Sequence, residues 1–301
     1  MIEGKHSQPK WRLACWCAPK TRVFGFLFWH AICLQRPDFV RGFLFLVWEL
    51  IMRLRRSVLL IVSLLGLLLA WQGLIWLTDL PDFILPSPMA VWARFVQLVR
   101  SGSLLRHFLT TLKEVLLGLA LGASVAMILG YLLAKSPLVE RLLAPYIVAS
   151  QSVPTVAIAP LLVIWFGPGL LSKVLIASLI VFFPVLVNTV VGVRAVPDDL
   201  HALMRSLQAT RWQTLWMLEI PAALPVFLGG LRVGATLAVI GAVVGEFVGS
   251  DSGLGFLINA GRGVYDTALV FVAVFVLIAM AMSLYGIVVS LENRLLAWQQ
   301  D

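Results

Sequence analysis

Charged residues are scarce in this sequence. Only 13% of its 301 residues are Asp, Glu, Lys or Arg, whereas 60% are hydrophobic and the mean hydropathy is +0.97. Soluble domains carry about 25% charged and about 45–50% apolar residues. The composition therefore excludes a disordered chain, a disulfide scaffold and an ordinary soluble enzyme. It favours a chain that crosses a membrane several times, because long apolar segments need lipid around them.

Residues that carry chemistry are also scarce. The three cysteines all precede residue 34, and no Cys or His pair at metal-ligand spacing accompanies them, so neither a metal site nor a cofactor is expected. The chain has no Gly-x-x-x-x-Gly-Lys-Ser/Thr and no His-Glu-x-x-His. It also has no basic run with interleaved aromatics, which argues against nucleic-acid binding. A membrane enzyme is a remote alternative, and no catalytic residue is assigned.

The first 51 residues differ from the rest. Their apolar runs, Phe24–His30 and Phe39–Leu50, are too short to cross a bilayer, which takes about 20 residues. An arginine-rich start at Met52 then leads into a long apolar run. We expect residues 1–51 to be an interfacial or dispensable extension, and residues 52–301 to form the membrane domain.

Six later segments are apolar and long enough to span a bilayer, which predicts an all-α, polytopic membrane protein with six transmembrane helices. They are Ser57–Leu77, Leu104–Ala134, Leu138–Phe166, Leu171–Val193, Ala222–Val248 and Ala268–Leu291. Prolines interrupt the third segment at positions 145, 154 and 160. The fifth, together with Gly249 directly after it, contains three glycine pairs at four-residue spacing, which predicts close packing against a neighbouring helix or a second copy.

The basic residues between the spans suggest an orientation. With both termini in the cytoplasm, nine Lys and Arg residues lie on the inner side and five on the outer side. The inner set is Arg53, Arg55, Arg56, Lys135, Arg141, Arg194, Arg205, Arg211 and Arg294, and the outer set is Arg94, Arg100, Arg106, Lys173 and Arg262. This excess places the polar insertion Pro197–Glu219 in the cytoplasm.

Two short helices are predicted within that insertion. Pro197 and the two aspartates after it suit a helix start, and apolar residues then recur at positions 200, 203, 204 and 207 on one helical face. Thr210 and Gln213 fit a capping box for the second helix, which is expected to end at Pro221. The insertion is either a compact cytoplasmic knob or a loop lying on the lipid surface.

The insertion resembles the EAA loop of permeases from binding-protein-dependent ABC importers. The family's Glu-Ala-Ala positions fall on Ala202, Leu203 and Met204, and its glycine falls on Gln208, where a turn with positive φ is expected. In that family the loop carries a coupling helix that docks in a groove of the ATPase subunit. The resemblance therefore implies an ATPase-coupling role for Leu200, Ala202, Leu203, Met204, Arg205, Ser206, Leu207, Gln208, Ala209 and Thr210.

Further motifs extend the resemblance over residues 57–298. In family order they are Leu-Pro-Ser-Pro at 85–88, Gln-Ser-Val-Pro at 151–154, the segment 159–167, Phe-Phe-Pro at 182–184 followed by Asn-Thr at 188–189, and Gly-Leu-Gly at 253–255. Together they resemble the nitrate/sulfonate/taurine branch, and residues 241–249 resemble its permeases for riboflavin or a thiamine precursor. The resemblance implies an ATP-binding subunit, an extracytoplasmic solute-binding protein and a second permease copy as partners, in an inner membrane.

A permease needs polar groups along its path. The candidates are Gln151 and Ser152 beside Pro154, Asn188 after Pro184, and Glu246. Amides and carboxylates are costly in lipid, which favours an inward-facing position for them. For the hydroxyl groups the alternative is a bond back to their own helix. For Glu246 it is a place at the outer interface.

Overall fold

The structure, a computed structural model, describes residues 58–59, 62–63, 65–78 and 81–297. The predicted extension 1–51 lies outside these residues. The first predicted span, Ser57–Leu77, is described only in part, and its longest continuously described stretch is the helix Leu65–Thr78. Residues 71–301 form one compact unit. The following description concerns that unit.

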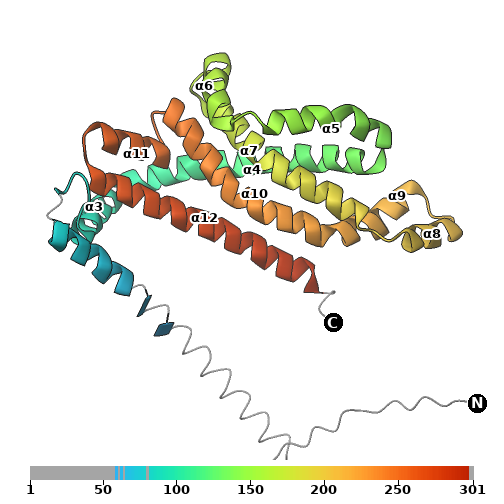
Figure 1. The fold of residues 1–301 in the computed structure, drawn as a ribbon, viewed down its shortest axis with the longest axis horizontal. Helices are drawn as coiled ribbons and strands as arrows, with labels where there is room; N and C mark the ends of the chain where they lie inside the picture. Colours follow the sequence, from blue (N-terminus) through green and yellow to red (C-terminus); the bar gives the residue numbers. More distant parts are fainter. Residues whose placement is uncertain (1–57, 60–61, 64, 79–80, 298–301) are drawn as a thin grey trace, which may run out of the picture. The chain divides into compact units, whose positions relative to one another are not determined.

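Helices make up the described part of this unit, and no strand occurs in it. In chain order (Figure 1) they are α3 Pro88–Arg100, α4 Ser103–Lys135, α5 Pro137–Gln151, α6 Thr155–Phe166, α7 Leu170–Arg194, α8 Asp198–Ser206, α9 Arg211–Thr214, the π-helix η1 Leu215–Glu219, α10 Ile220–Val248, α11 Leu254–Gly263 and α12 Thr267–Leu295. Four of the predicted spans are confirmed as α4, α7, α10 and α12, each long and apolar enough to cross a membrane.

The third predicted span is a broken one. Helices α5 and α6 meet at a bend of 95°, and they count as one span only if taken together. The break lies at Pro154, whose backbone is extended, and the residue before a proline also disfavours helical geometry. Pro145 and Pro160 lie within α5 and α6 and end neither helix. Of the three prolines, only Pro154 therefore divides the span.

The prediction that Pro221 ends the helix of the cytoplasmic insertion is wrong. The chain continues from α9 through η1 into α10 as one span, Arg211–Val248. In η1 the turn widens, so that the Ile220 N–H bonds to the Leu215 carbonyl five residues earlier. A proline lacks an N–H and can enter a helix only where that donor is not needed. The wide turn before Pro221 provides such a place.

Helix α7 packs against both α4 and α10, and glycines make both contacts close. A methyl group built on Gly118 of α4 would lie 2.5 Å from Ala177 Cβ, and one on Gly241 of α10 would lie 2.6 Å from Ala177 Cα. Gly122 and Gly234 meet Val181 in the same way. Small residues let helix backbones approach where lipid offers no hydrophobic drive. The predicted close packing of the fifth span is confirmed, with α7 as the neighbour.

Candidate functional site

Two of the predicted path residues line one groove. Gln151 at the end of α5 and Asn188 on α7 border a cavity of about 460 Å³ beside the break at Pro154. Phe183 and Pro184 of α7 line it as well, together with Thr155 at the start of α6. None of the described residues that line this groove carries a charge. The sequence motifs around Pro154 and Pro184 therefore come together at one place in the fold.

Asn188 is held in the groove by its own helix. Its Nδ2 donates to the Pro184 carbonyl at 2.8 Å, while no donor among the described residues reaches its Oδ1. Gly230 of α10 leaves the space for this side chain, because a methyl group there would lie 2.6 Å from Asn188 Cβ. Asn188 can therefore offer a fixed amide oxygen to a solute. The spacing of Gly230 and Gly234 predicts close helix packing, but the sequence does not indicate that Gly230 makes room for Asn188.

The other two predicted path residues lie outside this groove. Ser152 caps the end of α5, and its hydroxyl donates to the Val148 carbonyl at 3.4 Å. Glu246 belongs to α10 and is only 1% exposed. Its carboxylate takes part in a separate polar cluster. A role for Glu246 in the path stays a prediction that its position does not support.

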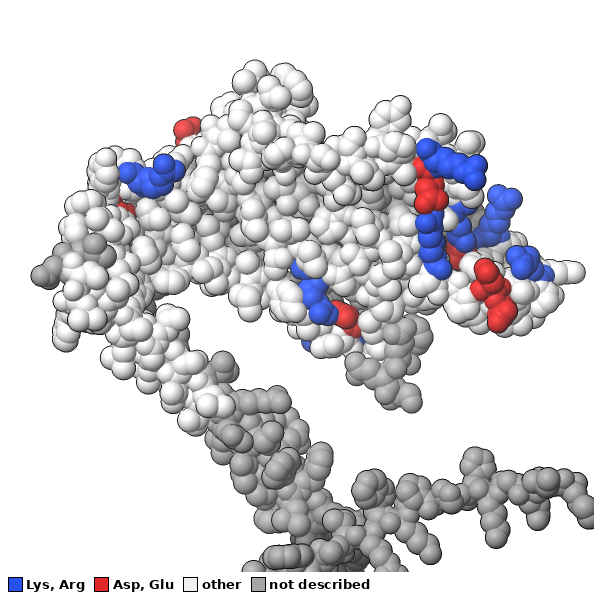
Figure 2. Space-filling model, viewed as in Figure 1, with Lys and Arg blue, Asp and Glu red and all other residues white. Residues whose placement is uncertain are grey.

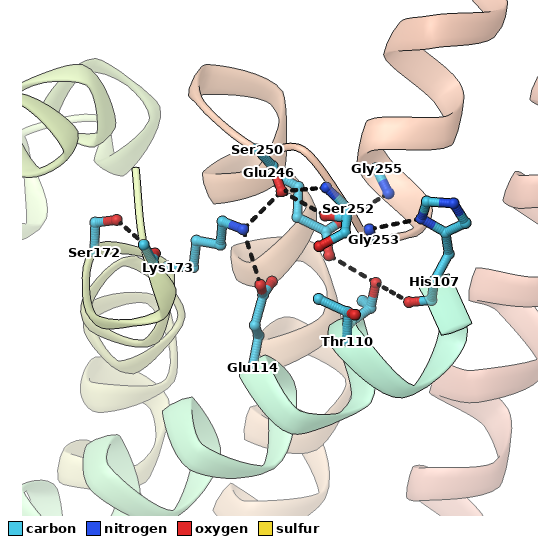
Figure 3. A network of polar contacts seen from close by, with 12 residues as sticks. His107, Thr110, Glu114, Ser172, Lys173, Glu246, Ser250, Ser252, Gly253 and Gly255 are labelled. Carbon is cyan, nitrogen blue, oxygen red and sulfur yellow. Dashed lines mark hydrogen bonds and ion pairs between the residues drawn. The ribbon is translucent and has the colours of Figure 1, made fainter. Parts of the chain in front are cut away.

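That separate cluster joins three helices through ionisable groups. Glu114 of α4, Lys173 of α7 and Glu246 of α10 are 1%, 5% and 1% exposed, and we call them the buried charge cluster. Lys173 Nζ lies 3.1 Å from Glu114 Oε1 and donates to Ser250 Oγ at 2.6 Å (Figure 3). Ionisable residues inside membrane spans are rare and are usually paired. Lys173 was not predicted as a cluster member. It is the third residue of the predicted span Leu171–Val193 and was counted among the basic residues on the outer side.

The same cluster caps the start of α11. The Gly255 N–H donates to Glu246 Oε2 at 2.5 Å, and Thr111 Oγ1 donates to Glu246 Oε1 at 2.6 Å. The Leu254 N–H donates to Thr111 Oγ1, and the Gly253 N–H donates to His107 Nδ1 (Figure 3). These donors are the ones that a helix N-terminus leaves without partners in its own helix. Side chains of α4 and α10 thus fix the position of α11.

Gly253 has a backbone conformation that side chains rarely adopt, with φ of +118°. A methyl group on it would also overlap the Glu246 carboxylate. The Gly-Leu-Gly motif at 253–255 is therefore explained by the close approach of this turn to Glu246.

The predicted knob is present as α8, a turn and α9. None of the residues of α8 is buried, and its apolar face is open, with Leu203 52% and Leu207 67% exposed. Gln208 has a positive φ of 54°, as the turn requires, and Thr210 and Gln213 form the predicted capping box. Most charged side chains visible in Figure 2 gather at the end of the molecule where α8 and α9 lie.

The sequence of this chain is similar to those of a family of membrane transport proteins. A sequence profile of the family described as binding-protein-dependent transport system inner membrane component matches residues 118–297. The chain is 49% identical over 238 residues to a riboflavin transport system permease protein of Chloroflexus aurantiacus, covering 79% of this chain and 89% of that protein. It is 37% identical over 218 residues to a formylaminopyrimidine transport permease protein of Halalkalibacterium halodurans, covering 72% and 87%.

A solved structure has a similar fold. Inward-facing MetNI, a methionine ABC transporter, superposes with a TM-score of 0.58 at 16% identity, covering 65% of this chain and 97% of that chain. The chain belongs to the family of inner membrane components of binding-protein-dependent transport systems. It is a multi-pass permease subunit of an ABC importer, in which a separate ATPase subunit hydrolyses ATP and a binding protein supplies the solute.

Proposed function

We propose that this permease passes riboflavin or a related heteroaromatic vitamin through the groove between the α5–α6 break and α7. The observation that carries the proposal is the pairing of Gln151 and Asn188 in one uncharged groove next to Phe183. A flat ring with amide-like edges suits an aromatic face and two side-chain amides. The 49% identity to a riboflavin permease supports the same class of solute.

A sulfonate, taurine or nitrate is the second candidate. The chain is 33% identical to a putative aliphatic sulfonates transport permease of Bacillus subtilis and 31% identical to a taurine permease of Escherichia coli. Sulfonate and nitrate groups are anions, which are held most strongly by Arg or Lys donors. No described residue lining the groove supplies such a cation, which favours the neutral vitamin.

The proposal also covers the second permease copy, the orientation in the membrane and the contact with the ATPase. Two copies of the chain complete the path, and both termini face the cytoplasm, in line with the nine inner and five outer basic residues. The knob of α8, the turn and α9 then lies where an ATPase subunit binds, and it carries the coupling residues between Leu200 and Thr210. The open apolar face of α8 supports this docking, because it has no partner within the knob.

Riboflavin uptake is expected to depend on this permease. Vesicles carrying the permease, its ATPase and its binding protein should accumulate labelled riboflavin when ATP is supplied, and excess unlabelled riboflavin should compete while taurine should not. Absence of ATP-dependent riboflavin accumulation, together with accumulation of labelled taurine or nitrate under the same conditions, would contradict the solute assignment and favour the second candidate.

Replacing the groove amides should impair uptake. Gln151→Leu and Asn188→Leu each remove a polar partner of the solute, a loss of about 1–3 kcal/mol, or about 5- to 150-fold in rate of uptake. Assembly with the ATPase and basal ATP hydrolysis should remain. Gln97→Leu is a matched control, because Gln97 is an exposed amide on α3. Normal uptake by both groove variants would show that the amides are structural.

A further inference from the structure

A buried carboxylate lies where the cytoplasmic knob joins the membrane helices. Glu219, the last residue of η1, is only 4% exposed. Its Oε1 lies 2.5 Å from Lys135 Nζ, and its Oε2 accepts a hydrogen bond from the Tyr131 hydroxyl at 3.0 Å. His201 of α8 brings its Nδ1 to 3.9 Å from Oε1. These four side chains, which we call the Glu219 joint, connect α8, η1 and α4.

The Glu219 joint attaches η1 to the end of α4 through two side chains of α4. Tyr131 and Lys135 are four residues apart and therefore lie on the same face of α4, one on each oxygen of Glu219. The other root of the knob is attached to the same region. Arg194, at the end of α7, pairs with Glu140 Oε2 at 2.6 Å and donates to the Leu133 carbonyl. Both roots of the knob are thus tied to the cytoplasmic end of α4 and the start of α5.

The packing beside the joint is incomplete. A cavity of about 340 Å³ lies between η1 and the ends of α4, α7 and α10, and Tyr131, Leu215 and Glu219 are among the residues that line it. Apart from Tyr131, Thr189 and Glu219, the residues that line it are apolar. This cavity is an open groove, because Ile128 and Leu132 of α4 are 60% and 45% exposed, so η1 has few contacts to lose on this side when it shifts. Single π-helical turns also occur frequently at functional sites.

We propose that Glu219 is a positioning residue that transmits movement of α8 to α4 and thereby to α7, which packs against α4 and lines the groove. The proposal rests on the docking of α8 to the ATPase. A rigid polar contact connects the knob to α4, and the open groove beside η1 lets η1 move with the knob. The ordinary alternative is a pin that only keeps the knob folded. The two roles differ in one outcome. When the Lys135–Glu219 ion pair is lost, a transmitting residue leaves the ATPase bound to the knob, whereas a structural pin does not.

The test follows the groove itself and needs no solute. Val187→Cys places a reporter in the groove, where Val187 is exposed, with Cys15, Cys17 and Cys33 replaced by serine. In the purified complex with the ATPase, ATP with vanadate should change the rate at which a water-soluble maleimide labels this cysteine by about tenfold. Adding Glu219→Gln should reduce the change to less than about twofold, with the ATPase still bound.

Two further variants make the result specific. The exchanged pair Lys135→Glu with Glu219→Lys should restore a change of at least about fivefold, because the ion pair is rebuilt in reverse. Glu292→Gln is the matched control, since Glu292 pairs with Arg232 between α12 and α10 and should leave the tenfold change intact.

Three results would overturn the transmitting role of Glu219. They are an unchanged labelling response to ATP in Glu219→Gln, no recovery of that response in the exchanged pair, and loss of the ATPase from the Glu219→Gln complex. A parent complex that never retains the ATPase, or never responds to ATP, would instead overturn the docking proposal itself.

Discussion

Leu203→Asp and Leu207→Asp are each expected to release the ATPase subunit from the purified complex. Leu203 lies on the open face of α8 and Leu207 directly follows this helix, and burying a leucine in a partner's groove contributes about 1.5–3 kcal/mol. A carboxylate in the same place adds the cost of removing a charge from water. The combined effect should lower affinity for the ATPase by about 100-fold or more and abolish uptake. Co-purification followed by quantitative gel analysis measures the loss.

Ala202→Glu provides the matched control. Ala202 is exposed on α8, about 200° around the helix from Leu200, so the added carboxylate lies away from the apolar face. It also stands at the position where the resembling family has Glu. This variant should retain the ATPase, and all three variants should insert into the membrane normally. Retention of the ATPase at the parent ratio by both leucine variants would remove the support for docking through α8.

Lys173→Met is expected to destabilise the membrane domain severely. Lys173 is the cation of the buried charge cluster, and one oxygen of Glu114, Oε2, has no hydrogen-bond partner among the described residues even with Lys173 present. Removing one partner of a buried ion pair costs about 3–5 kcal/mol, because the other charge is left without compensation. The free energy of unfolding, measured by titration with SDS, should fall by about that amount. Low yield of folded permease should accompany it.

Two companion variants separate charge from packing. Lys113→Met makes the same substitution at an exposed position of α4 and should change stability by less than about 0.5 kcal/mol. Lys173→Met combined with Glu114→Gln removes both charges of the pair and should recover most of the lost stability. If the double variant is as unstable as Lys173→Met alone, the loss comes from packing around the side chain, and the ion pair is not the cause.

Local features of this chain could be predicted because each depends on neighbouring residues. The ends of α4 lie within one residue of the predicted span, since apolar composition between charged ends defines a crossing segment. The positive φ of Gln208 and the capping box of Thr210 and Gln213 were also expected, because turn and cap chemistry act over a few residues. The EAA-like pattern then indicated the family.

Other local predictions failed where backbone geometry had more than one solution. Pro221 was expected to end a helix, but the wide turn of η1 accommodates it. The third span contains three prolines, and the 95° bend lies at Pro154, whereas α5 and α6 continue through Pro145 and Pro160. A proline restricts its own turn and the residue before it, but whether a helix continues past it depends on the surrounding packing.

The sequence by itself determined the class of this protein: an apolar, helical permease with a polar knob between two spans and small residues for close helix contacts. Tertiary structure alone decided which distant groups meet. Gln151 and Asn188 share a groove, Lys173 joins Glu114, and Glu219 binds Lys135. The reason is physical. Apolar composition specifies that a helix lies in the membrane, whereas the partner of each polar side chain depends on the rotation and register of packed helices, which periodicity does not encode.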